Sequence, residues 1–147
     1  MTRNQLKYAS NNTWINKSIT YPDYNRILGL IQADLGNTGV SPDALHHLFL
    51  IVSNSKKFKP TEVPGDVVTM NSEILVRMEN KQEKTIKIVY PHDANTPEDI
   101  SVYQPIGTAC LGAMENSVVY YSDATGDHKA YIKKITFQPE KEKLYNL

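Results

Sequence analysis

The sequence predicts an α+β protein in which a short antiparallel helical hairpin precedes an antiparallel sheet that carries one short helix. Apolar residues recur at helical spacing through residues 21–55, and the period changes to the alternation of strands after Pro60. A chain of 147 residues has room for one ordinary domain with a short appendage. We therefore expect an N-terminal extension at 1–20, a coiled-coil-like hairpin at 21–61 and a sheet domain at 62–147.

The N-terminal extension is rich in Asn and Thr and shows no clear period. It has no apolar stretch with a cleavage site, which a secretory signal would need. Trp14 and Ile15 are its prominent apolar residues, and we expect them to anchor the extension against the body of the protein.

The first helix of the hairpin is predicted from its boundaries and from one apolar stripe. Thr20 and Pro22 suit a helix start, and Gly36 suits a helix end. The stripe consists of Tyr24, Ile27, Leu28, Ile31 and Leu35.

The second helix begins after a short turn, with Ser41 as the expected N-cap and Pro42 in the first helical position. Its stripe consists of Leu45, Leu48, Phe49 and Val52. The basic run Lys56–Pro60 should close this helix, since cations complement its negative end; a phosphate-binding patch is the alternative. Helices joined by so short a turn should lie antiparallel and bury their stripes against each other.

The sheet domain reads as short alternating strands separated by Pro, Gly and polar turns. Val67 and Val68 lead into the first strand. The predicted strands are Ile74–Met78, Thr85–Tyr90, Ile100–Tyr103, Val118–Tyr121 and Ala130–Phe137. The segment Pro105–Leu111 should form the short helix, which Gly112 ends.

Composition and charge narrow the function classes. The formal net charge is zero, which argues against attraction of the whole protein to nucleic acid. The charge is divided, because residues 1–61 carry a net +4 and residues 62–147 a net −4. The sequence lacks the run of about 18 apolar residues that a membrane span needs. A cytoplasmic protein without a membrane partner is the expectation.

No constellation of catalytic or metal-binding residues stands out. His46 and His47 would point about 100° apart on a helix and cannot chelate one metal. His92 and His128 have no recognisable catalytic motif around them, and Cys110, the single cysteine, lies in an apolar stretch typical of a buried thiol. We expect a protein that is not an enzyme, with no cofactor and no metal site.

Two acidic residues near the hairpin turn leave one alternative open. Asp34 and Asp43 flank the turn and could together hold a divalent ion, although two carboxylates near a turn are more often caps and solubilising charges. Asn37 and Thr38 form the tip between them.

The segment Ile100–Gly107 joins a short strand to a short helix and presents a Tyr, a Pro and an Ile around the turn. It can be a structural corner or a docking loop, and local chemistry does not decide between the two.

Four sequence blocks resemble the C-terminal domain of the bacterial Gre transcription-factor family. They are Val63–Ser72, Ile88–Pro91, Ile100–Gly112 and Phe137–Glu140. Each block alone is weak, but the combination is specific, and the resemblance covers about half of the chain. Within the family the Rnk branch is the more similar.

The resemblance implies an FKBP-like fold for the sheet domain and docking on the rim of the RNA polymerase secondary channel. By position, the residues that would carry the contact are Ser101, Tyr103, Gln104, Pro105 and Ile106. Gre factors typically have Asp in place of Tyr103 and Ser in place of Gln104, so docking here should be weaker or differently composed. The Rnk branch also departs from the acidic pattern at this place.

Hairpin length then separates two functions within the family. A cleavage-stimulating arm needs helices of roughly 30 residues, about 45 Å long, whereas the helices predicted here would reach about 20–25 Å. The tip residues Asn37 and Thr38 cannot replace carboxylates at a metal site. We expect a polymerase-binding regulator that meets nucleic acid only through the polymerase and does not stimulate transcript cleavage. The alternatives are a Gre-type cleavage factor and, by fold analogy alone, a peptide-binding or prolyl isomerase module.

Overall fold

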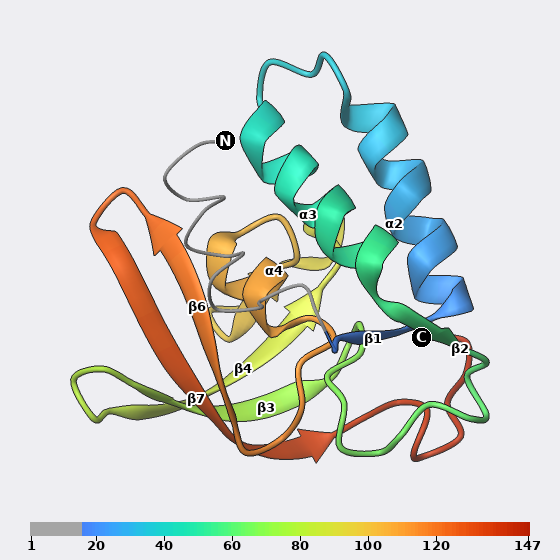
Figure 1. The fold of residues 1–147 in the computed structure, drawn as a ribbon, viewed down its shortest axis with the longest axis vertical. Coiled ribbons are helices and arrows are strands. Elements are labelled where there is room, and N and C mark those ends of the chain that lie inside the picture. Colours follow the sequence, from blue (N-terminus) through green and yellow to red (C-terminus); the bar gives the residue numbers. More distant parts are fainter. Residues whose placement is uncertain (1–15) are drawn as a thin grey trace.

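The computed structural model describes residues 16–147, so the expected anchors Trp14 and Ile15 lie outside the described residues (Figure 1). The elements in chain order are β1 (Ser18–Thr20), α2 (Tyr21–Asp34), α3 (Pro42–Asn54), β2 (Lys56–Phe58), β3 (Glu73–Met78), β4 (Glu83–Val89), η1 (Pro91–Asp93), β5 (Asp99–Ser101), α4 (Pro105–Cys110), β6 (Ser117–Asp123) and β7 (Gly126–Phe137). None of the helices in this described part is long and apolar enough to cross a membrane.

Both predicted helices of the hairpin are confirmed, together with their caps. The Thr20 hydroxyl accepts from the Asp23 amide at 3.2 Å and starts α2. The Ser41 hydroxyl accepts from the Ala44 amide at 3.3 Å and starts α3. These hydroxyls satisfy amides that have no partner within the helix, which is why the local sequence predicted both starts.

The apolar stripes are buried along most of their length, but not at Leu35 and Phe49. The buried members of the two stripes are Ile27, Ile31, Leu45, Leu48 and Val52. Leu35 is 65% exposed and Phe49 is 43% exposed, so their predicted burial is wrong. Leu35 follows the last residue of α2 at the tip end of the hairpin, whereas Phe49 lies within α3 between the buried Leu48 and Ile51 and stands at the edge of the buried face.

The hairpin is closed at its base by two short parallel strands. β1 precedes α2, β2 follows α3, and Ser18 pairs with Lys56 while Thr20 pairs with Phe58. Part of the run Lys56–Pro60, which was predicted to close the second helix, also forms a strand that the sequence pattern did not predict. The helix-capping role is confirmed for Lys57, whose Nζ donates to the carbonyls of Ser53 and Ser55, each at 2.9 Å.

The predicted five-stranded sheet is confirmed, with the strand order β5-β4-β3-β7-β6. Three of its neighbouring pairs are antiparallel, whereas β4 and β5 are parallel, from Lys87 opposite Asp99 to Val89 opposite Ser101. Val67 forms a single bridge to Met114 and no strand, which corrects the predicted lead into β3.

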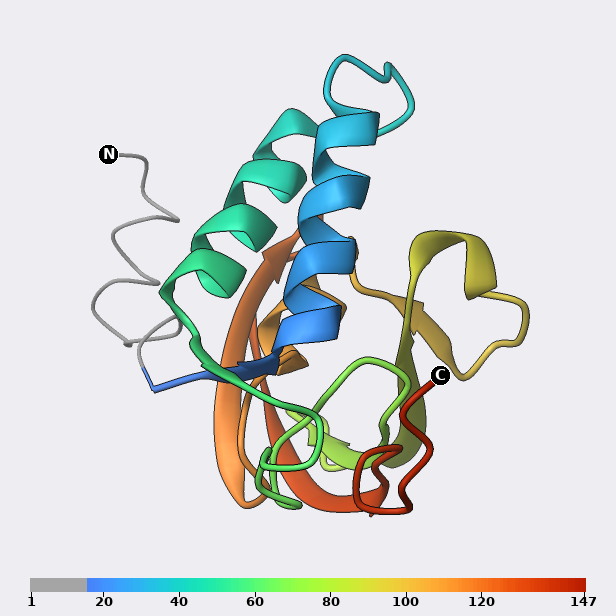
Figure 2. The same cartoon turned by 90° about the vertical axis from the view of Figure 1, so that its right-hand side faces the viewer.

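One hydrophobic core joins the hairpin to the sheet. Ile27 and Leu48 from the hairpin, Ile88 from β4, Ile132 from β7 and Cys110 from α4 all belong to it. Figure 2 shows the hairpin rising from the sheet, with the turn between α2 and α3 at the end farthest from the strands. The turn is therefore presented to solvent, while the lower part of the hairpin is fixed to the body.

Candidate functional site

The loop between β5 and α4 is a tight, hydrogen-bonded corner. The Ser101 hydroxyl accepts from the Tyr103 amide at 3.1 Å, and the Ser101 carbonyl accepts from the Gln104 amide at 2.9 Å. Pro105 then occupies the first turn of α4, where its missing N–H costs nothing. The structural role of Ser101 leaves Gln104, which is exposed, and the half-buried Pro105 and Ile106 as the presented part of the loop.

Gly107 allows α4 to lie directly on this corner. A Cβ at position 107 would stand 2.3 Å from the Ser101 carbonyl oxygen and 3.2 Å from the Val102 Cα, both backbone atoms. The Thr108 hydroxyl closes the same contact by donating to the Val102 carbonyl at 2.5 Å. The shape of the loop thus depends on a glycine that the sequence pattern alone did not single out.

The hairpin tip is ordered by its own polar groups. The Asn37 amide donates to the Asp34 carbonyl at 3.0 Å, and the Asn37 side-chain oxygen accepts from the Gly39 amide at 3.0 Å. Gly36 has φ +82°, the left-handed conformation that suits glycine after a helix. Thr38 and Asp43 are exposed.

The two groups of predicted site residues meet in space. The Tyr103 hydroxyl donates to a carboxylate oxygen of Asp34 at 2.6 Å, across 69 positions of sequence. Desolvation, and then the hydrogen bond to the Asp34 charge, raise the pKa of Tyr103 above its usual value. The hairpin and the loop before α4 therefore contact each other. The Tyr103 hydroxyl is already hydrogen-bonded within the protein.

This contact bears on the possible ion site at the tip. Asp34 is turned to Tyr103, and within residues 16–147 no group of three or more His, Cys, Asp or Glu side chains is placed to hold a metal ion. The carboxylate of Asp34 instead joins two parts of the fold.

A buried carboxylate fixes the base of α2 to the sheet domain. Asp23 is 5% exposed; its oxygens accept from the Met70 amide at 3.1 Å and from the Tyr90 hydroxyl at 3.1 Å. The Arg26 guanidinium lies 4.8 Å from the centre of the Tyr90 ring. Burial raises the pKa of Asp23 to about 6, although the hydrogen bonds from Met70 and Tyr90 oppose the shift. Sequence reasoning missed this residue, since an acid in a first helical turn is usually exposed.

A buried lysine fixes the other side of the hairpin base to α4. Lys17 Nζ donates to the carbonyls of Ala109, at 2.5 Å, and Leu111, at 3.1 Å, near the end of α4. Burial lowers the pKa of Lys17 to about 8 and raises that of the neighbouring Cys110 thiol to about 12. Cys110 is fully buried, as predicted, and such a thiol has little nucleophilic thiolate at neutral pH.

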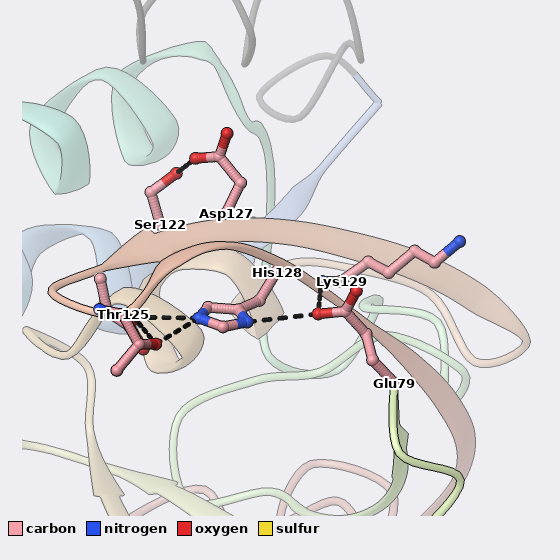
Figure 3. Close-up of polar contacts among 7 residues, drawn as sticks. Glu79, Ser122, Thr125, Asp127, His128 and Lys129 are labelled. Atoms are coloured by element: carbon pink, nitrogen blue, oxygen red, sulfur yellow. Dashed lines mark hydrogen bonds and ion pairs between the residues drawn. The ribbon is translucent and has the colours of Figure 1, made fainter.

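His128 has the polar partners that its sequence context did not reveal (Figure 3). Its Nδ1 lies 3.2 Å from a Glu79 carboxylate oxygen, and its Nε2 lies 2.6 Å from the Thr125 hydroxyl and 3.0 Å from Asp123. Desolvation of the ring lowers its pKa, but the hydrogen bonds to Asp123 and Glu79 outweigh this and raise it. The cluster joins the β6–β7 turn to Glu79, directly after β3, and both carboxylates are substantially exposed. We interpret the cluster as a structural polar contact that links the two turns.

The structure is a small sheet domain with an attached helical hairpin, and the corner at Ser101–Ile106 belongs to the sheet domain. Residues 63–137 match the family described as transcription elongation factor, GreA/GreB, C-terminal domain. This match spans just over half of the 147 residues. The chain belongs to the GreA/GreB family of transcription elongation factors.

Two relatives place the chain more closely within the family. It is 33% identical over 87 residues to the regulator of nucleoside diphosphate kinase of Escherichia coli K12, the Rnk protein, and to the same regulator of Shigella flexneri. These matches cover 55% of this chain and 62% of each relative. The structure of a GreA/GreB elongation factor from Nitrosomonas europaea is 27% identical, with a TM-score of 0.68, and the match covers 82% of this chain and 99% of that one. The predicted resemblance to the Gre family and its Rnk branch is confirmed.

Proposed function

We propose that the protein is an RNA polymerase-binding regulator of transcription that docks at the secondary-channel rim and does not stimulate transcript cleavage. The observation that carries the proposal is the GreA/GreB C-terminal domain at residues 63–137. The similarity to the regulator of nucleoside diphosphate kinase favours a regulatory role over a cleavage role.

The proposed docking surface is the outer side of the loop before α4. Gln104 is exposed and Pro105 and Ile106 are partly exposed, on a corner that Ser101 and Gly107 hold rigid. A rigid loop loses little conformational freedom on binding, which favours affinity. Tyr103, which is partly exposed, contributes without its hydroxyl, because that group is bonded to Asp34.

The hairpin is too short for the cleavage role and is held against the body. α2 has 14 residues and α3 has 13, so each is about 20 Å long, less than half of the roughly 45 Å expected of a cleavage-stimulating arm. The hydrogen bond from Tyr103 also keeps Asp34 turned to the body. A regulator of this shape would act by occupying the rim and competing with longer-armed factors for it.

The docking surface predicts a loss of polymerase binding in Ile106→Asp and in Gln104→Arg. An added charge at either position has to be desolvated in the contact, so we expect binding to core polymerase to weaken about tenfold or more. Binding is measured by interferometry with purified core enzyme. Leu144→Asp, at a residue that is 47% exposed in the C-terminal tail, is the matched control and should bind normally.

Gln104 is exposed, so its variant separates lost binding from misfolding, which could affect the half-buried Ile106. Absence of binding by the unmutated protein would contradict the proposal.

Backtracked elongation complexes test the cleavage alternative. We expect no shortened RNA when the protein is added alone, and slower cleavage when it is added together with a cleavage-stimulating member of the family. Shortened RNA in the presence of the protein, lost in Asp34→Ala or Asp43→Ala, would establish a cleavage factor instead.

A further inference from the structure

The hairpin carries an apolar hollow to which the proposed docking loop contributes no residue. We call it the crease: a groove of about 440 Å³ between α2 and α3. Its lining includes Leu28, Gln32, Leu35, Leu45, His46 and Phe49. Every lining residue belongs to one of the two helices or follows α2 directly.

The crease is exposed although it is apolar. Leu35 and Phe49 are 65% and 43% exposed, and they are the two members of the predicted stripes that the core leaves uncovered. An exposed Phe and an exposed Leu in one hollow mark a surface whose burial against a partner is favourable. Two antiparallel helices offer a groove that a third helix fills with its side-chain ridges.

The charge around the crease specifies the kind of partner. None of the 16 Lys and Arg residues of the chain lies in residues 27–55 or 88–116. These two segments adjoin in space through the hydrogen bond between Tyr103 and Asp34. Their acidic residues are Asp34, Asp43, Asp93, Glu98, Asp99 and Glu115. The segments around the crease therefore carry acidic residues and no Lys or Arg, while the cations among residues 16–147 lie toward the hairpin base, in the sheet and its turns, and in the C-terminal tail.

We propose that the crease binds a basic amphipathic helix of a partner protein. Apolar side chains one turn apart on that helix would enter the hollow beside Leu35 and Phe49. Lys and Arg beside them would face the acidic surroundings, to which Asp34 and Asp43 contribute at the tip end of the hairpin. Nucleic acid and other phosphate-bearing partners are disfavoured, since the acidic residues of these two segments would repel them. The inference does not depend on polymerase docking, which uses the loop before α4.

The test uses two fluorescent peptides of about 14 residues, long enough for an apolar stripe of three to four turns. One peptide combines Leu with Lys at helical period, and the other combines Leu with Glu. Fluorescence anisotropy with the full chain should show micromolar binding of the Lys peptide and about tenfold weaker binding, or none, of the Glu peptide.

Phe49→Asp separates specific docking from general charge attraction. If the crease is the site, the variant binds the Lys peptide about tenfold more weakly, because a charge replaces the apolar contact. Under general attraction the extra negative charge would strengthen binding, and that result would overturn the proposal.

Leu144→Asp makes the same change of charge at a residue of similar exposure (47%) and should keep the affinity of the unmutated protein. Equal binding of the two peptides, or an equal loss in Leu144→Asp and Phe49→Asp, would likewise overturn the proposal. Phe49 is exposed enough for the variant to fold, which circular dichroism checks.

Discussion

Gly107→Ala should destabilise the protein by about 3 kcal/mol and lower its midpoint of thermal unfolding by about 10 °C. The added methyl would stand 2.3 Å from the Ser101 carbonyl oxygen and 3.1 Å from the Ser101 carbonyl carbon. Neither atom belongs to a flexible side chain, so α4 has to move away from the corner before it. The measurement is urea and thermal unfolding followed by circular dichroism.

Gly29→Ala is the matched control, because it makes the same chemical change inside α2. No atom lies within 4 Å of a Cβ placed there, and the residue is exposed. Alanine is the better helix former, so this variant should gain up to about 1 kcal/mol. Equal stabilities of the two variants would show that α4 does not rest on the corner as described.

Asp23→Ala should cost about 2–4 kcal/mol of unfolding free energy, an effect of similar size. The change leaves the Met70 amide and the Tyr90 hydroxyl buried without their acceptor. Asp23→Asn keeps a carbonyl oxygen for Met70 and removes the buried charge. It should therefore remain within about 1 kcal/mol of the unmutated protein at neutral pH.

The contribution of Asp23 to the free energy of unfolding changes with pH in the direction opposite to that of most carboxylates. Its pKa in the folded protein is raised to about 6, above the value of the unfolded chain. Its contribution is fully present below the unfolded pKa of about 3.9 and is lost as the pH rises through about 6. From about pH 7.5 to pH 4.5 the unmutated protein should gain about 2 kcal/mol relative to Asp23→Asn. Urea unfolding at both pH values measures the difference; a constant gap would contradict the raised pKa.

The helices and their ends could be predicted because their determinants are local. Thr20 and Ser41 each cap an amide three positions along the chain, and the stripes repeat within a few turns. The burial of Leu35 and Phe49 was predicted wrongly because a stripe shows which face is apolar but neither how wide the buried part of that face is nor where along the helix it ends. How much of a helix face is buried depends on the tertiary structure and not on the local sequence.

Contacts between residues far apart in the sequence could not be predicted from the sequence pattern. β1 and β2 have three residues each, too few for a visible period, and they pair across the whole hairpin. The parallel pairing of β4 with β5 depends on the course of the chain through η1. Residue types also mislead: Asp23 and Lys17 carry charges, and nothing local marks them as buried.

The candidate site was predicted as two separate lists of residues, one in the loop and one at the hairpin tip. The structure joins them at Tyr103 and Asp34, which are 69 positions apart. The contact assignments within the loop remain a prediction for polymerase binding to test.

The paired strands β1 and β2 make the hairpin a module of adjustable length. Both ends of the helical excursion are held side by side, at Ser18 with Lys56 and at Thr20 with Phe58. Whole turns could be inserted symmetrically next to the tip, in both helices, without changing the spacing of the ends or the sheet below. One body can in this way carry arms of different reach, and a chimera with the longer arm of a relative grafted between β1 and β2 should fold on the same base.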